Sequence, residues 1–94
     1  MTVVVKFVGA LRSVSGANQL KIDLAKGQLL KDLINEVVGK MPRLEKSLLD
    51  KQLEEPKPNA LVLVNGREIS VLRGLETSLK DGDEIVFIPV VHGG

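Results

Sequence analysis

The sequence predicts an α+β domain, in which one β-sheet carries a single main helix on one face. Two segments with the period-two alternation of strands open the chain, a segment with the 3.6-residue period of a helix follows, and further strand-like segments close it. Strands and helix gathered in separate parts of the chain are typical of α+β proteins. Because 94 residues suffice for one core, we expect a single domain over residues 1–94.

The composition limits the classes of function. The net charge is +1 and no basic stripe with interleaved aromatics occurs, so nucleic-acid binding has little support. The chain has no cysteine, which excludes a disulfide, a thiolate zinc site and a catalytic thiol on this chain. We find no signal peptide and no apolar stretch long enough to span a membrane. We therefore expect a cytoplasmic protein with no membrane partner.

The N-terminal part predicts a hairpin. Residues 2–9 and 19–25 alternate as strands, and we expect them to pair antiparallel. Val3, Val5 and Phe7 fall on one face of the first strand, which predicts that this face is buried. The connection predicts a short helical turn that Gly16 closes.

The next segment predicts the main helix. Its apolar face consists of Leu29, Leu30, Leu33, Ile34, Val37 and Val38. We expect Gly27 to cap its N-terminus and Gly39 to follow its last turn. A weaker helical pattern spans residues 43–54, and two prolines predict a loop over residues 54–59.

The C-terminal part predicts three more strands. Residues 60–64 form a buried strand, and the Asn65-Gly66 turn returns the chain into a short polar edge strand over residues 67–70. After a single turn near residues 75–78, the almost continuous apolar run 84–88 predicts a central strand buried on both faces. Two hairpins flanking a helix, with the last strand returning to the centre of a mixed five-stranded sheet, describe a β-grasp (ubiquitin-like) fold.

The chain ends on two glycines, and we expect residues 89–94 to form an extended, flexible tail. Pro89 ends the pairing of the last strand and stiffens the base of the tail. Gly93 and Gly94 have no Cβ, so the terminal carboxylate can enter a narrow slot on a partner. A tail of this length reaches about 20 Å when extended.

Several motifs together carry a resemblance to a known family. They are Leu63-Val64-Asn65-Gly66, the run from Leu79 to Pro89 with its Asp81-Gly82-Asp83 turn, the terminal Gly93-Gly94, and Ala10-Leu11-Arg12 with Gly16 after the first strand. The chain resembles the small subunit of molybdopterin synthase (MoaD type), in the MoaD/ThiS family of ubiquitin-like sulfur carriers. The thiamine-pathway carrier ThiS is shorter and lacks a segment like residues 40–58, which favours the molybdopterin branch.

The resemblance implies a carrier that is not catalytic by itself. An E1-like adenylating enzyme (MoeB type) uses ATP in trans to adenylate the carboxylate of Gly94, and sulfur then displaces AMP to leave a thiocarboxylate. In the molybdenum-cofactor branch, a complex with the larger synthase subunit (MoaE type) passes this sulfur to a pterin. The chain has no phosphate loop and no cysteine, so activation and sulfur must come from partners. We expect no permanently bound cofactor and no metal.

We expect the partner-binding residues at the base of the tail. Val90 and Val91 are apolar residues outside any predicted strand, and such exposed residues usually mark interaction sites. We add to them, as further expected contacts, Pro89, His92, Arg12 and the outward-facing apolar residues of the last strand, Phe87 or its neighbours in that strand.

Two other functions stay open at this point. MoaD-type tails usually contain Pro-Pro-Val, whereas here a single Pro89 is followed by Val90-Val91-His92. The His-Gly-Gly ending is nearer to that of the eukaryotic ubiquitin-related modifier. The chain could therefore be a modifier that is conjugated through Gly94 to lysines, or a carrier for tRNA thiolation. The other alternative is a β-grasp interaction module with an irrelevant tail.

Overall fold

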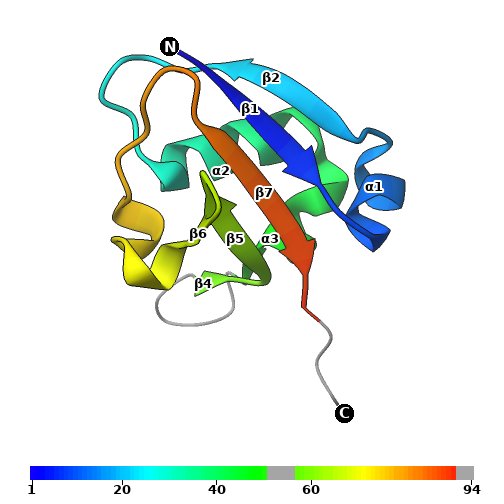
Figure 1. Ribbon diagram of the computed structural model, residues 1–94. Coiled ribbons are helices and arrows are strands. Elements are labelled where there is room, and N and C mark those ends of the chain that lie inside the picture. The colour runs from blue at the N-terminus through cyan, green and yellow to red at the C-terminus, as the bar shows by residue number, and fades with distance from the viewer. Residues whose placement is uncertain (51–56, 91–94) are drawn as a thin grey trace.

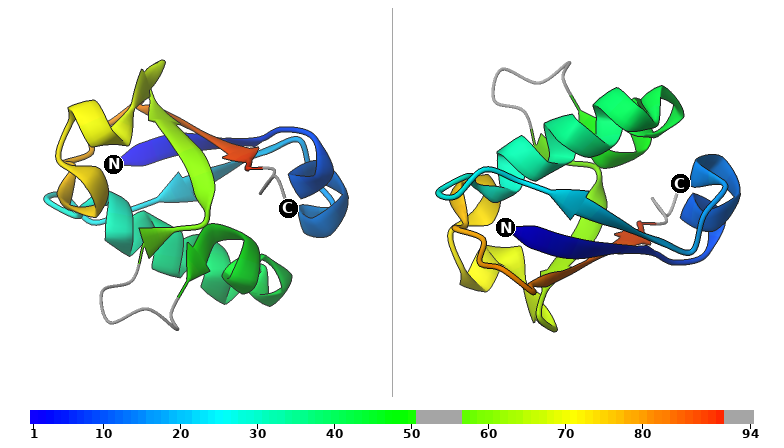
Figure 2. Two further views of the ribbon diagram at one scale, coloured as in Figure 1. Left: turned by 90° about the horizontal axis from the view of Figure 1, so that it is seen from below. Right: turned by 90° about the horizontal axis from the view of Figure 1, so that it is seen from above.

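The computed structural model describes residues 1–50 and 57–90 of the chain (Figure 1). In this part of the chain, a mixed five-stranded sheet has the strand order β2-β1-β7-β5-β6, and a separate two-stranded sheet pairs β3 with β4. Helix α2 lies against one face of the larger sheet (Figure 2). The predicted α+β class and β-grasp fold are confirmed.

The elements have the following bounds. The strands of the larger sheet are β1 (Thr2–Phe7), β2 (Gln19–Asp23), β5 (Ala60–Val64), β6 (Arg67–Glu68) and β7 (Glu84–Pro89). The α-helices are α1 (Ala10–Ser15), α2 (Leu30–Lys40) and α3 (Glu45–Leu48). The remaining elements are the short strands β3 (Leu49–Asp50) and β4 (Lys57–Pro58) and the 3₁₀ turns η1 (Pro42–Leu44), η2 (Ile69–Val71) and η3 (Gly74–Glu76).

Strand β7 occupies the centre of the sheet, as predicted. It pairs parallel with β1 and antiparallel with β5, so that Phe87 lies between Phe7 and Val62. The predicted antiparallel hairpin of β1 and β2 is also present, and β6 lies at the edge. Because the two strands run parallel, the C-terminal end of β7 lies beside the C-terminal end of β1, at one end of the sheet.

The core lies between the sheet and α2, and the period of each element determines which side chains enter it. Alternate strand residues point inward: Val3, Val5, Phe7, Ile22, Val62, Val64, Ile85 and Phe87 are buried. From α2, the predicted apolar face contributes Leu30, Leu33, Ile34 and Val37. The rings of Phe7 and Phe87 stack with centroids 6.0 Å apart, in the range where offset aromatic pairs attract.

Both predicted ends of α2 are wrong. The N-terminus is not at Gly27, because the Asp32 carboxylate accepts the backbone N–H of Leu29 at 2.8 Å and so caps the helix from its third residue. The C-terminus lies beyond Gly39, which is inside the last turn. The N–H of Met41 still donates to the Val37 carbonyl at 2.8 Å, and Pro42 then begins a 3₁₀ turn.

The predicted helix over residues 43–54 is much shorter in the structure. Helix α3 ends at Leu48, whose carbonyl accepts the N–H of Asn59 at 3.1 Å, and the chain then enters the β3–β4 pair. Part of the predicted helix and loop, residues 51–56, lies outside the described residues.

The predicted edge strand 67–70 is also shorter. The Glu68 carboxylate accepts the N–H of Ser70 at 2.7 Å, and a 3₁₀ turn starts at residue 69.

The loop before β7 is fastened to the start of α2. The N–H of Leu30 donates to the Thr77 carbonyl at 2.9 Å, and Lys31 forms a 2.9 Å ion pair with Glu76. The hydrogen bond that the Lys31 ammonium donates to the Glu76 carboxylate raises the pKa of Lys31, and the negative charge of Glu76 adds to this effect. Within residues 1–50 and 57–90, no helix has the length and apolarity needed to cross a bilayer.

The two faces of β7 should differ in their effect on stability. Phe87→Ala empties a fully buried position and should lower the free energy of unfolding by about 3–5 kcal/mol. Ile88→Ala removes a half-buried side chain on the opposite face and should cost about 1 kcal/mol. Urea denaturation of both variants measures the difference, and equal losses would contradict the assignment of the inner face.

Candidate functional site

The candidate site begins where β7 ends, at Pro89 and Val90. Pro89 is the last strand residue and still lies opposite Ala60, so the sheet continues through the residue at which we expected the tail to start. Val90 follows outside the strand and is 46% exposed, which confirms the exposed apolar position expected there. The sheet thus pairs with the tail only at its first residue, Pro89.

Glycine at position 9 gives Pro89 the room it needs. Gly9 has φ +59° and ψ −135°, a backbone conformation that side chains disfavour strongly. A Cβ at this position would also approach Cγ of Pro89 to 3.3 Å. The turn between β1 and α1 therefore passes tightly over the end of β7 because residue 9 is glycine.

A hollow of about 260 Å³ lies beside the base of the tail. Its lining includes Leu11 and Val14 of α1, Lys46 of α3, and Pro89 and Val90 at the base of the tail. The start of the tail therefore lies beside apolar side chains of α1 and the cation of Lys46. We did not predict this feature, because it joins segments that are far apart in the sequence.

Arg12 lies on α1, close to the same edge of the sheet. Its Nε donates to the backbone carbonyl of Phe7 at 3.1 Å, and the side chain is exposed. Since Phe7 lies opposite Phe87 in the parallel β1–β7 pair, this bond places a guanidinium near the base of the tail. Arg12 is thus positioned for the partner contact that we expected of it.

Four of the predicted site residues lie outside the described part of the chain: Val91, His92, Gly93 and Gly94. Among residues 1–50 and 57–90, no three His, Cys, Asp or Glu side chains gather in a way that could hold a metal ion.

Phe87 does not belong to an exposed partner surface, and that prediction is corrected. Its side chain is fully buried and packs on Phe7, because it points toward α2. The expectation that β7 is buried on both faces is also wrong, since Val86 and Ile88 on its outer face are only half-buried. A helix covers one face of the sheet and leaves these residues on the other.

The outer face of the sheet instead presents an apolar patch. Ile88 lies opposite Leu61, and Val86 lies opposite Leu63 in the β5–β7 pair. We call these four residues the outer apolar patch. All four are half-buried or exposed, and Leu61 is 37% exposed. The patch continues along β7 toward the base of the tail, so one partner can contact both.

The edge of the outer apolar patch is charged. Lys6 on β1 forms a 2.9 Å ion pair with Glu84 on β7, and both side chains are more than 40% exposed. An exposed pair of this kind contributes little to stability. Its position beside apolar residues resembles the polar rim around the apolar centre of many interfaces.

The sequence contains a signal for this patch. Glu84 is a charged residue at the start of an otherwise apolar run, and it must face water. By period two, Val86 and Ile88 share its face and Phe87 takes the other. The polar residue fixes the phase that the apolar run alone leaves ambiguous.

Comparison with known proteins gives a consistent set of relatives. The model of the ThiS family matches residues 5–94. The chain is 40% identical over 78 residues to a candidate sulfur carrier protein of Archaeoglobus fulgidus, covering 80% of this chain and 83% of that protein. It is 34% identical over 98 residues to small archaeal modifier protein 3 of Haloferax volcanii, covering all of both chains.

Solved structures agree with these sequence matches. The chain is similar to small archaeal modifier protein 1 of Methanosarcina acetivorans, with a TM-score of 0.82 and 34% identity over 99% of this chain and 96% of that one. It is also similar to a candidate molybdopterin converting factor, subunit 1, of Pyrococcus furiosus, with a TM-score of 0.77 and 25% identity over 97% and 99% of the two chains. A chain in the complex of subunits 1 and 2 of the molybdopterin-converting factor of Helicobacter pylori shares the fold, with a TM-score of 0.61 and 24% identity over all of both chains.

The contact between Gly9 and Pro89 can be tested by adding one methyl group. Gly9→Ala should lower the free energy of unfolding by about 1–3 kcal/mol, because it strains the backbone and presses on Pro89. Gly16→Ala is the control. Gly16 has φ +75° and ψ 12°, and no atom lies within 4 Å of the added Cβ, so the cost should be about 1 kcal/mol. Urea denaturation measures both, and a Gly9 variant no less stable than the control would refute the contact.

Proposed function

Because the chain belongs to the ThiS family of ubiquitin-like sulfur carriers, we propose that it carries sulfur as a thiocarboxylate at Gly94. The observation that carries this proposal is the position of the base of the tail. Central strand β7 ends at Pro89, the exposed Val90 follows it next to the outer apolar patch, and Gly93-Gly94 comes within four residues in the sequence. A partner that binds the patch can therefore take up the tail at the same time.

The proposed chemistry has two steps. The Gly94 carboxylate is an anion at neutral pH and attacks the α-phosphorus of ATP, releasing pyrophosphate. The resulting acyl-adenylate is open to substitution, because AMP is a good leaving group. Hydrosulfide delivered by a partner attacks the acyl carbon, the bond to the AMP oxygen breaks, and AMP and one proton depart, which leaves the thiocarboxylate.

The body of the protein contributes binding in this scheme, and an E1-like partner of the MoeB type supplies catalysis. The chain has no phosphate loop and no cysteine, so ATP and sulfur are handled on the partner. The hollow beside Pro89 and Val90 and the sheet pairing of Pro89 limit the freedom of these two residues before binding, which lowers the entropy that they lose when a partner binds. This ATP-dependent step belongs in the cytoplasm.

We further propose that the acceptor pathway is molybdopterin synthesis, with this chain as the small subunit of the synthase. The similarity to the Pyrococcus furiosus protein and the resemblance of residues 79–89 to the MoaD type support this branch. The larger MoaE-type subunit would bind the outer apolar patch and take the tail into its own active site. Capture of such a subunit by the full chain would distinguish this branch from thiazole synthesis or tRNA thiolation.

A second function has its own support. The end-to-end match to small archaeal modifier protein 3 and the His-Gly-Gly ending favour a protein modifier, joined through Gly94 to lysines of other proteins. The same adenylate serves both functions, since either sulfur or an amine can displace AMP. A ladder of higher-mass bands on a denaturing gel would support conjugation, and its absence in both sulfur-replete and sulfur-starved cells would count against it.

Sulfur loading of the C-terminus is the first test of the proposal. When the full chain is coexpressed with a cognate adenylating enzyme and a sulfur donor, its intact mass should rise by one oxygen-to-sulfur exchange. Deletion of Gly94 should abolish the exchange and leave the urea midpoint unchanged, because the core ends before the tail. If the full chain gains no sulfur, the proposal fails.

Binding through the outer apolar patch can be tested separately. Leu61→Asp places a charge in the patch and should weaken binding to the adenylating enzyme at least about tenfold, or about 1.4 kcal/mol. Gln19→Asp adds the same charge at an exposed site on β2, on the same face of the sheet, and should leave affinity unchanged. Calorimetry compares the two, and equal affinities would exclude the patch as the binding surface.

A further inference from the structure

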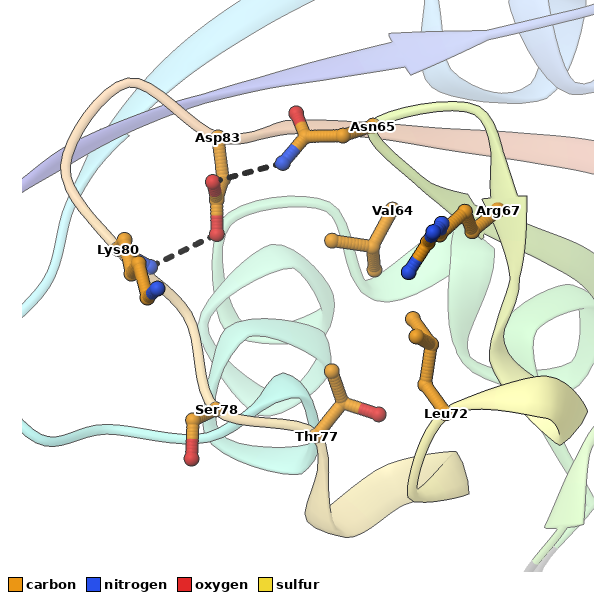
Figure 3. A pocket seen from close by; sticks show the side chains of 8 residues that line it. All are labelled: Val64, Asn65, Arg67, Leu72, Thr77, Ser78, Lys80 and Asp83. Carbon is orange, nitrogen blue, oxygen red and sulfur yellow. Dashed lines mark hydrogen bonds between the residues drawn. The ribbon is translucent and has the colours of Figure 1, made fainter.

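A second hollow lies at the end of the sheet opposite to the tail. It has a volume of about 360 Å³ and is bounded by the β5–β6 turn, by η2 and by the loop before β7 (Figure 3). Lys80 and Asp83 line it just before β7 begins, whereas the tail leaves from the other end of the strand. A six-residue strand separates the two sites by about 20 Å. The proposed sulfur chemistry does not use this hollow.

Two cations face the hollow without an acidic partner. Figure 3 shows the side chain of Arg67 directed into the space above Leu72, with Lys80 on the opposite wall. Within the described residues, neither cation forms an ion pair, because the ion pairs there join Lys6 to Glu84 and Lys31 to Glu76. Asp83 also lines the hollow, so Arg67, Lys80 and Asp83 together leave its lining with one net positive charge.

The nearby carboxylates are engaged elsewhere. Glu76 and Glu84 are in the two ion pairs, the Glu68 carboxylate accepts the N–H of Ser70, and Asp81 accepts the N–H of Thr2 at 2.7 Å. None of these four carboxylates forms a salt bridge with Arg67 or Lys80 in the described part of the chain.

Asp83 is the one acid that lines the hollow, and it serves as a brace. One carboxylate oxygen accepts Nδ2 of Asn65 at 2.8 Å, and the other accepts the backbone N–H of Lys80 at 2.7 Å. The Asn65 side-chain oxygen in turn accepts the N–H of Glu84 at 2.9 Å. These bonds hold the two loops that carry Arg67 and Lys80 at a fixed separation.

The rest of the wall is partly apolar and partly hydroxylated. Val64 and Leu72 give an apolar side, and the exposed Ser78 adds a hydroxyl group. The Thr77 hydroxyl is already used, since it donates to the Gly74 carbonyl at 2.7 Å and accepts the N–H of Arg73. A ligand would therefore meet Arg67 and Leu72 on one wall of the hollow and Lys80 and Ser78 on the other (Figure 3).

We propose that this hollow binds a small phosphate ester. The guanidinium of Arg67 matches a phosphate group as a planar fork, and Lys80 adds a point charge. The organic part of the ester packs on Leu72 and Val64. A volume of about 360 Å³ lies at the lower end of the range for ligand pockets, which limits the ligand to one ring or a short chain.

Phenyl phosphate is a suitable probe, because it combines a phosphate with one ring. In an NMR titration of the full chain at constant ionic strength, we expect saturable shifts at Arg67 Nε–H and at the Lys80 amide, and ring-current shifts at the Leu72 methyls. Inorganic phosphate should shift the two cations without the ring-current effect, and phenol should shift none of them. These two compounds separate recognition of the anion from packing of the ring.

Matched variants complete the test. Arg67→Gln and Lys80→Gln should each raise the dissociation constant at least about fivefold, through loss of a charge-assisted hydrogen bond. Lys21→Gln removes an exposed lysine on β2 and should leave it unchanged. All three positions are exposed, so unchanged spectra elsewhere verify the fold. Shifts that rise linearly without saturation, or equal weakening by the Lys21 variant, would overturn the site.

Discussion

The structure depends on the parallel pairing of β1 with β7. Parallel neighbours need a long crossover, and here the whole middle of the chain, including α2, provides it. The pairing inserts the last strand between the two hairpins and stacks Phe87 on Phe7. It also makes both strands end at the same end of the sheet, so the turn at Gly9 and the side chain of Arg12 lie close to the base of the tail. The stability of the core and the position of Pro89 at the base of the tail therefore follow from the same contact.

Alternate side chains of β7 point to opposite faces of the sheet, so one strand both holds the core and forms an exposed surface. Ile85 and Phe87 point to α2 and hold the fold, while Val86 and Ile88 point away from it and form the outer apolar patch with β5. The strand also has two distinct ends. One end continues into Pro89 and Val90 and the tail, and the other begins at the braced loop of Asp83. A partner on the outer face and a small ligand at the far end can bind without competing for the same residues.

Much of this arrangement was predictable from the sequence, since local patterns fixed the strands, the main helix and the central place of β7. The errors occurred where a distant or polar contact decided the outcome. The Asp32 carboxylate caps α2, so glycine is not needed there, and strand pairing ends α3 at Leu48. The apolar run 85–88 does not by itself show which alternate residues face the core, so the inward position of Phe87 was not recognised. The two hollows could not be predicted, because each joins segments far apart in the sequence.

The central claim is that the folded body presents the tail to its activating partner. The most direct measurement compares the full chain with a synthetic peptide of residues 84–94 in ATP–pyrophosphate exchange by the adenylating enzyme. If the outer apolar patch and the base of the tail supply the binding energy, kcat/KM for the peptide should be lower by at least about 100-fold, or about 2.8 kcal/mol. A peptide that is activated as efficiently as the full chain would contradict the account.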